Sequence, residues 1–222
     1  MRRNIQFPNY ANYTQAQTIR KLTDARIGDY VIRPSSKRDD CLTLSWKFYD
    51  NHYVHNTILE ENKTGGASLG AVLRIGSEEY SSLQEINDRY MKEVTKRVND
   101  VVHHAKFIKM SCFADMEEFL KGEQKKNPKN IPYRFTILTE YPQHVVLSYI
   151  SPSKRVIKEF IKVRPRGFWF HNMNHISFDH MIAWFKSNYR DMSYRKFVKK
   201  QKSPRAVTQQ VYEEMKQSST WE

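Results

Sequence analysis

The chain has 222 residues, a formal net charge of +13, and 39% hydrophobic residues that include 13% aromatic ones, so it can build a packed core and is not an extended disordered chain. It has only two cysteines, which excludes a disulfide framework and a four-cysteine zinc site, and it has no apolar run of the roughly twenty residues that span a bilayer. The excess of positive charge predicts a polyanionic partner: nucleic acid, an anionic membrane, or an acidic or phosphorylated protein.

The first half of the chain combines a helical pattern with several strand patterns. Apolar residues at three-residue spacing predict a helix over about residues 14–22. Alternation of apolar and polar residues then predicts strands at 28–33, 42–48 and 53–61, and residues 68–75 form a further ordered segment.

A second helical pattern begins near residue 82 and is longer than an average helix. Its apolar residues recur every three or four positions, and we expect it to reach Ala105 or Lys109. Two interpretations are open: the helix closes one domain and continues into the next, or it is an ordinary long core helix. The second half then repeats the order of helix, strands and helix, with elements expected at residues 115–121, 133–138, 145–150, 156–163, 168–170 and 178–188.

Arg33 lies at the end of the first expected strand and is followed by a short loop of hydroxyls and cations, which includes Ser35, Ser36 and Lys37. A guanidinium can contact two phosphate oxygens at once, while hydroxyls and loop N–H groups can bind the others. This pattern predicts a phosphate site. The alternative is a solvated arginine or one held in a structural ion pair.

The arrangement around Arg33 resembles the Src-homology-2 (SH2) family. The resemblance rests on four segments: GDYVIRPSS at 28–36, LTLSWKF at 42–48, YVH at 53–55 and YSSLQEI at 80–86. It implies that Arg33 binds the phosphate of a phosphorylated peptide, that Ser35 and the following loop assist, and that His55 forms part of the pocket wall. The implied phosphate-binding residues of the first unit are Arg33, Ser35, Ser36, Lys37 and His55.

Two positions depart from the family pattern. The basic residue that the family carries early in its first helix falls near Tyr13 or Thr14, and the lysine that follows the strand histidine falls on Thr57. Phosphotyrosine readers pack such cations against the phenol ring. Their loss makes phosphoserine or phosphothreonine plausible ligands, alone or beside phosphotyrosine, and the sequence leaves this choice open.

The second half carries no arginine at the expected position of Arg33, which falls near Ile137 or Leu138, so we expect an apolar, filled pocket there. With SLGAVLRIGSEEY at 68–80, IPYRF at 131–135 and WFKSNYRD at 184–191, the chain resembles the tandem SH2 modules of the Suppressor-of-Ty family of transcription elongation factors and histone chaperones. The implied fold is α+β, with two units that each have an antiparallel sheet and two flanking helices, joined by a long helix. We expect the units at residues 1–110 and 111–192, and a basic, flexible tail at 193–222.

The resemblance further implies a non-enzymatic, nuclear module that binds the phosphorylated largest subunit of RNA polymerase II, through its linker or its C-terminal domain. We expect no cofactor, no metal and no membrane partner, and a monomeric module of a larger protein. A second phosphate would bind basic residues of the second unit outside the usual pocket. The candidates are Lys186, Arg134, Lys154, Arg155, Lys158 and Arg190.

The sequence also contains features that bear on a nucleic-acid-binding domain, a phosphatase and a metal site. A nucleic-acid-binding domain would explain the net charge of +13, the lysines Lys125, Lys126 and Lys129, and the basic tail. A phosphatase would need a cysteine nucleophile in a phosphate-binding loop, and neither Cys41 nor Cys112 lies in one. The histidines at 171, 175 and 180 with Asp179 would suit a metal only if the segment were helical, whereas its aromatic residues favour strand and turn.

Overall fold

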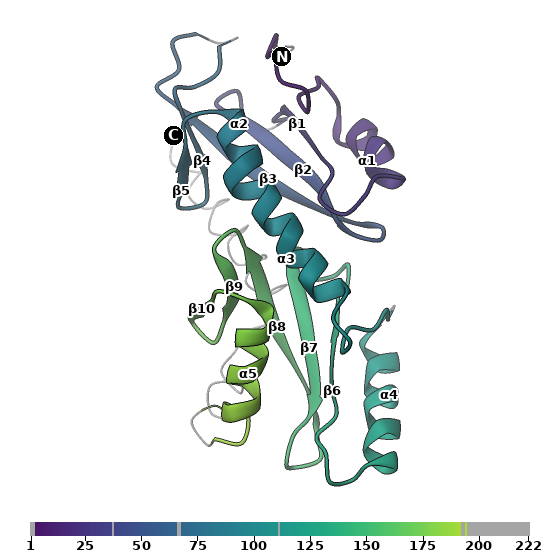
Figure 1. Cartoon of the computed structure of the whole chain (residues 1–222). Helices are drawn as coiled ribbons and strands as arrows, with labels where there is room; N and C mark the ends of the chain where they lie inside the picture. Colours follow the sequence, from purple (N-terminus) through teal and green to yellow (C-terminus); the bar gives the residue numbers. More distant parts are fainter. Residues whose placement is uncertain (1–2, 37, 66–67, 111, 192–193, 195–222) are drawn as a thin grey trace, which may run out of the picture. The chain divides into compact units, whose positions relative to one another are not determined.

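The computed structural model describes residues 3–36, 38–65, 68–110, 112–191 and 194 (Figure 1). The chain divides into two compact units, Met1–Asn99 and Asp100–Glu222. Lys37 and the basic segment 195–222 lie outside the described residues, and the domain limits expected at 110 and 192 remain predictions. None of the described helices is long and apolar enough to cross a membrane.

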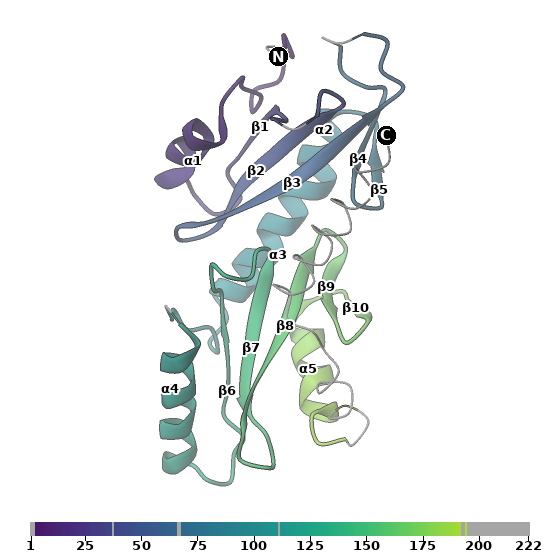
Figure 2. The same ribbon diagram turned by 180° about the vertical axis from the view of Figure 1, so that it is seen from behind.

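The first unit is built on a five-stranded antiparallel sheet in the order β1-β2-β3-β4-β5. Helix α1 precedes the sheet, and a helical stretch made of α2, the π-helix η1 and α3 follows it (Figures 1 and 2). The elements are α1 Gln15–Thr23, β1 Tyr30–Pro34, β2 Cys41–Tyr49, β3 His52–Glu61, β4 Val72–Ile75, β5 Glu78–Tyr80, α2 Leu83–Glu85, η1 Ile86–Met91 and α3 Lys92–Val102.

The two faces of this sheet pack against different helices because side chains alternate along each strand. Tyr30 and Trp46 are cross-strand partners on one face, and the Tyr30 hydroxyl donates to Asn87 Oδ1 of η1 at 2.9 Å. Lys47 follows Trp46 and therefore lies on the other face, where its Nζ donates to the carbonyl oxygen of Thr23, the last residue of α1. One face thus meets the later helix and the other meets α1.

The later helix of the first unit is shorter than the sequence predicted. It runs without a break from α2 to the end of α3 at Val102 and does not reach Ala105 or Lys109. His104 N–H donates to the carbonyl oxygen of Val101, and Phe107 N–H donates to that of His104, so the chain turns there. Phe107 then forms a parallel bridge with Phe135, which draws this segment away from a helical path.

The second unit repeats the order of the first. Its five strands form an antiparallel sheet in the order β10-β9-β8-β7-β6, preceded by α4 and followed by α5. The elements are α4 Phe113–Lys126, β6 Tyr133–Thr136, β7 His144–Ile150, β8 Val156–Arg164, β9 Gly167–Phe170, β10 Met173–His175 and α5 Phe178–Asn188. The α+β fold with two antiparallel sheets is therefore confirmed.

Candidate phosphate-binding site

Arg33 lies on β1 and faces the α1 side of the first sheet. Its cross-strand partner is Thr43 on β2, which in turn pairs with Thr57 on β3. We call these three residues the Arg33 row, since paired residues of antiparallel strands share a face. Ser45 and Lys47 lie two and four positions after Thr43 on β2, so they share its face of the sheet. Since Lys47 contacts α1, the Arg33 row faces α1 as well.

The guanidinium of Arg33 is buried and has no counter-ion in the described part of the chain. The residue is 5% exposed, its Nη1 donates to the carbonyl oxygen of Pro34 at 3.1 Å, and its Nε is buried without a hydrogen-bond partner. Burial also lowers its pKa below the usual value, although an arginine stays charged at neutral pH. A buried cation with unused donors favours an incoming anion.

The loop after β1 holds the other predicted residues of this site. Ser35 is half-buried and its N–H donates to the carbonyl oxygen of Cys41 at 3.2 Å, while Ser36 is exposed. The cation of Arg38 is taken up by Asp40, with Nε at 2.8 Å from Oδ1, on a pair that is open to solvent. Among the loop and strand arginines at 33 and 38, only Arg33 is therefore left to meet a phosphate.

His55 stands beside the Arg33 row on β3. It pairs with the buried Ser45, and its Nδ1 lies 2.8 Å from Ser45 Oγ. Packing of the ring against the sheet, and then the charge of Arg33, lower the pKa of His55 below its usual value. The ring is therefore neutral at pH 7 and contributes a wall and a hydrogen-bonding edge more than a charge.

The two departures from the family pattern are visible in the structure. Thr14 is the N-cap of α1: its hydroxyl accepts from Gln17 N–H, and its own N–H donates to the Gln17 side chain. Thr57, in the Arg33 row, is exposed and uncharged. Neither position supplies a cation to flank an aromatic ring.

The second unit carries an equivalent row with no charge in it. Thr136 on β6 pairs with Val146 on β7, which pairs with Phe160 on β8, and we call these residues the Thr136 row. The two hairpins have the same lengths, so one constant shift in residue number carries the Arg33 row onto the Thr136 row. Thr136, rather than Ile137 or Leu138, therefore stands where Arg33 stands in the first unit.

The space around the Thr136 row is filled by apolar side chains. Val146 and Phe160 form a buried cluster with Leu138 and Tyr141, against which Phe113 of α4 packs. Thr136 is 1% exposed and its hydroxyl has no hydrogen-bond partner in the described chain. The Thr136 row is therefore part of the packed core and contains no guanidinium.

The candidates for the second phosphate patch do not lie together. Arg134 and Lys158 are both paired with Ser148, so they share the α4 face of the second sheet. Arg134 forms an ion pair with Glu123 of α4, and the Lys158 ammonium lies 4.6 Å from the ring centre of Phe113. Both cations are therefore already engaged on that face.

Lys186 lies on the opposite face, where it meets a lysine that the sequence did not indicate. The ammonium groups of Lys186 and Lys106 lie 5.8 and 5.3 Å from the ring centre of Tyr133. Neither lysine has a carboxylate within ion-pair distance among residues that the structure describes. Two cations converging on one half-buried ring can receive an anion, and we call this set the Tyr133 patch.

The remaining candidates occupy other places. Lys154 and Arg155 are exposed in the turn between β7 and β8, and Arg190 follows α5 with its guanidinium 5.4 Å from the ring centre of Tyr189. The described residues contain no group of three or more histidines, cysteines and acids that could hold a metal. His171, one of the residues weighed for a metal, is instead bound to the buried carboxylate of Glu159.

The environment of Cys41 shows whether its thiol could act as the nucleophile of a phosphatase. Cys41 is buried at the start of β2, and burial with the adjacent Asp40 raises the pKa of its thiol to about 11. Because the thiolate is the nucleophile, this thiol is inert at neutral pH. Cys41 is therefore not suited to act as a nucleophile on a phosphate near Arg33.

Two antiparallel sheets, each with a helix before and after it, and one buried arginine on the first strand define a tandem module of the SH2 type. A sequence profile described as SH2 domain matches residues 1–188, and the chain belongs to this family, whose members are binding modules. The predicted resemblance is thereby confirmed at the level of the family.

Individual relatives point to one kind of SH2 protein. The chain is 32% identical over 196 residues to transcription elongation factor SPT6 of Drosophila melanogaster and 33% identical over 194 residues to an SPT6 homologue of Arabidopsis thaliana. These alignments cover 86% and 85% of the chain but only 11% and 12% of the relatives, so the chain spans a small part of their length.

Solved structures give the same picture. A tandem SH2 domain of elongation factor Spt6, described as binding the phosphorylated C-terminal repeat domain of RNA polymerase II, matches with a TM-score of 0.79 at 27% identity and covers 86% of this chain and 100% of its own. The tandem SH2 domains of Antonospora locustae Spt6 share the fold, with a TM-score of 0.67 at 19% identity over 82% of this chain and 93% of theirs.

Proposed function

We propose that this chain is a phosphopeptide-binding module that recruits a transcription elongation factor and histone chaperone to phosphorylated RNA polymerase II, and that it acts in the nucleus. Its relatives are elongation factors, and the solved relative at 27% identity is described as binding the phosphorylated polymerase repeat domain. The observation that carries the proposal is the buried guanidinium of Arg33, which has no carboxylate partner among the described residues.

Arg33 would bind the phosphate through its fork of N–H donors. The phosphate supplies the counter-ion that the described chain does not, and each charge-assisted hydrogen bond contributes about 1.5–3 kcal/mol. Ser35 and Ser36 would bind the other oxygens, and Lys37 belongs to the same loop. The neutral His55 leaves Arg33 as the charge that dominates the pocket.

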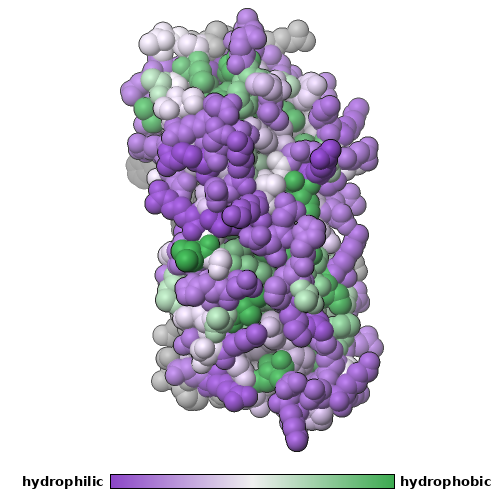
Figure 3. All heavy atoms as spheres, in the orientation of Figure 1, coloured by the Kyte–Doolittle hydropathy of each residue, from purple (hydrophilic) through white to green (hydrophobic). Residues whose placement is uncertain are grey.

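The ligand we favour is phosphoserine or phosphothreonine in the polymerase linker or repeat domain. Thr14 and Thr57 supply no cation at the two positions that hold a phosphotyrosine ring in the family pattern, whereas Arg33 is present for the phosphate. Hydrophilic residues cover most of the face seen in Figure 3, with smaller apolar areas between them.

A second phosphate would bind the Tyr133 patch of the second unit, with Lys186 and Lys106 as its cations. This proposal keeps the predicted Lys186 and replaces Arg134 and Lys158, which are engaged on the other face of the sheet. Two weak sites on one chain raise the overall affinity through effective concentration when one peptide carries both phosphates.

The test is a calorimetric titration of phosphorylated and unphosphorylated polymerase linker and repeat peptides against the wild type, Arg33→Ala and Arg38→Ala. Arg38→Ala is the matched control, because it removes an arginine that Asp40 already neutralises. We expect only the phosphorylated peptides to bind, and we expect this binding to be lost in Arg33→Ala but not in Arg38→Ala. Equal binding of all peptides to all three proteins would remove the proposal.

Parallel titrations with RNA and DNA, and with the phosphorylated peptide at several salt concentrations, separate the alternative of a nucleic-acid partner. That alternative rests on the net charge of +13 and predicts tight RNA or DNA binding whose affinity falls steeply with salt and does not depend on Arg33. Phosphopeptide binding through one main cation predicts a much shallower dependence on salt.

A further inference from the structure

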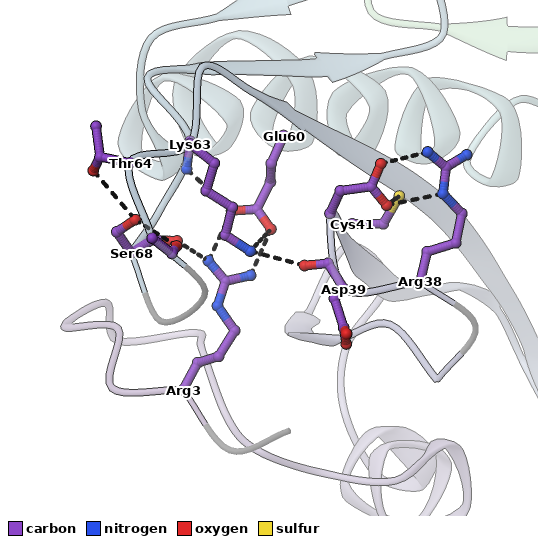
Figure 4. Close-up of polar contacts among 11 residues, drawn as sticks. Arg3, Arg38, Asp39, Cys41, Glu60, Lys63, Thr64 and Ser68 are labelled. Carbon is purple, nitrogen blue, oxygen red and sulfur yellow. Dashed lines mark hydrogen bonds and ion pairs between the residues drawn. The ribbon is translucent and has the colours of Figure 1, made fainter.

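The first unit contains a buried ion pair between two residues that are not among those expected to bind phosphate. Arg3 donates through Nη2 to Glu60 Oε1 at 2.8 Å and through Nη1 to Glu60 Oε2, and the two side chains are 3% and 0% exposed. Figure 4 shows the guanidinium of Arg3 pointing into the loop that follows β3, with Glu60 and Ser68 around it. The partners are 57 residues apart, so the pair ties the start of the chain to the third strand.

Glu60 is the centre of several contacts and not merely one half of a pair. Its Oε1 also accepts from Gly70 N–H at 3.1 Å, and the Lys63 ammonium lies 3.7 Å from its Oε2. Arg3 Nη2 in addition reaches the carbonyl oxygen of Ser68. A buried carboxylate that lost these partners would be strongly disfavoured, so they hold one another in place.

The cluster reaches the loop that follows Arg33. The Lys63 ammonium donates to the carbonyl oxygen of Asp39 at 2.8 Å (Figure 4). The Glu60 N–H donates to the carbonyl oxygen of Asp40 at 2.9 Å. Asp39 and Asp40 form the end of the loop whose beginning carries Ser35 and Ser36. The far end of the candidate phosphate loop is therefore fastened to Glu60 by one backbone contact and one lysine.

We propose that Arg3 and Lys63 are positioning residues for phosphate binding: Arg3 holds Glu60 and Lys63, and Lys63 holds the loop at Asp39 in the conformation that presents Ser35 and Ser36 to the ligand. This inference rests on the proposed function of Arg33. Neither residue needs to touch the phosphate, since the Lys63 ammonium is directed at a backbone carbonyl and the Arg3 guanidinium is enclosed with Glu60.

The inference has a consequence in the ligand-free protein. Without the lysine contact, the loop keeps its covalent ends but loses a side-chain bond at its far end, at Asp39, so its amides open more often. Amide hydrogen exchange at residues 35, 36 and 38–40 should therefore become faster in Lys63→Met, and faster still in Arg3→Met. Exchange in β6–β8 of the second unit should not change.

The experiment compares Lys63→Met with Lys96→Met, which removes the same charge from an exposed site on α3. We expect Lys63→Met to weaken phosphopeptide binding about three- to tenfold, as for one lost hydrogen bond to a positioned loop. Binding is measured well below its Tm, because the change also removes a cationic partner of the buried Glu60. Lys96→Met should match the wild type in affinity and exchange. Identical affinity and loop exchange in the two lysine variants would overturn the inference.

Arg3→Met also removes the counter-ion of Glu60 and lowers stability, so binding is measured well below its Tm. Arg3→Lys keeps the charge but not the two-pronged contact and should lie between wild type and Arg3→Met in loop exchange. The outcome is separable from that for Arg33. Loss of binding in Arg33→Ala with no effect of Arg3 or Lys63 contradicts only the positioning role, whereas unchanged binding in Arg33→Ala contradicts the proposed function.

Discussion

The two units place the same row of three residues on the same face of the same three strands and use it in opposite ways. The Arg33 row ends in a buried cation with an unpaired Nε, whereas the Thr136 row belongs to a packed apolar cluster. The two units have the same strand register at these rows, but the side chains differ: an arginine with two threonines in the first unit, and a threonine with two apolar residues in the second. The fold by itself therefore does not make a phosphate site, and the site depends on the residue at one position.

A second contrast concerns the arginines on the first strand of each unit. Arg134 of the second unit lies on the α4 face of the sheet, as the Thr136 row does, but its charge is neutralised by Glu123 of α4. Arg33 has no such partner in the described chain. A basic residue on the correct face is thus insufficient, and the absence of an internal carboxylate distinguishes the candidate site from a structural ion pair.

The largest change in stability that we predict comes from loss of packing in the Thr136 row of the second unit. Phe160→Ala removes a buried ring from the Thr136 row and should cost about 3–5 kcal/mol of unfolding free energy. Binding of a singly phosphorylated peptide by the first unit should stay unchanged below the unfolding transition. Chemical denaturation and calorimetry measure the two quantities, and a selective loss of phosphate binding at full stability would show that the row is not merely core.

The stability of the first unit should depend on pH through the buried His52. Burial lowers the pKa of His52 to about 4, so the unfolded state, with a pKa of about 6.5, binds a proton that the native state does not. The unfolding free energy contributed by His52 is therefore full above pH 6.5 and decreases by up to about 3 kcal/mol as the pH falls toward 4.

The variant His52→Phe should show a smaller drop in stability between pH 7 and pH 4.5 than the wild type. The measurement is a pair of urea unfolding curves at each pH, and the relevant quantity is the difference between the two. An equal drop in both proteins would mean that His52 is protonated in the native state or is not buried.

The predicted effect at the Tyr133 patch is smaller. Lys186→Ala and Lys106→Ala should each weaken binding of a doubly phosphorylated peptide about threefold to tenfold, because each removes one exposed or half-exposed cation. Binding of a peptide with one phosphate at the Arg33 site should not change. Lys154→Ala, in the turn between β7 and β8, is the matched control, and an equal effect of this variant would reduce the patch to general electrostatic attraction.

Much of this comparison could be predicted from the sequence, and the reasons for the rest are physical. Alternation placed Arg33 at a strand end and the apolar spacing located both helices that flank each sheet. The equivalent of Arg33 was misplaced at Ile137 or Leu138, because register is fixed by pairing across the hairpin, which gives Thr136. A short strand such as β6 contains too few residues to reveal that register alone.

Residues whose roles depend on partners far away in the sequence, such as Lys106 and Arg3, have no local sequence pattern that predicts those roles. Lys106 lies in the turn between α3 and α4 and meets Lys186 only through the ring of Tyr133. Arg3 is one of two adjacent arginines at the start of the chain, and its buried partner Glu60 is distant in sequence. The π-helix η1 differs from an α-helix by its hydrogen bonding, which the apolar spacing does not resolve.

The most direct measurement of the central claim compares Arg33→Ala with Thr136→Val, two changes at equivalent positions of the two units, in titrations with one phosphorylated polymerase peptide. We expect Arg33→Ala to weaken binding at least about a hundredfold, as for two lost charge-assisted hydrogen bonds, while Thr136→Val removes only an unpaired hydroxyl and keeps the wild-type affinity. An Arg33→Ala protein that is folded and still binds the phosphorylated peptide like the wild type would contradict the account.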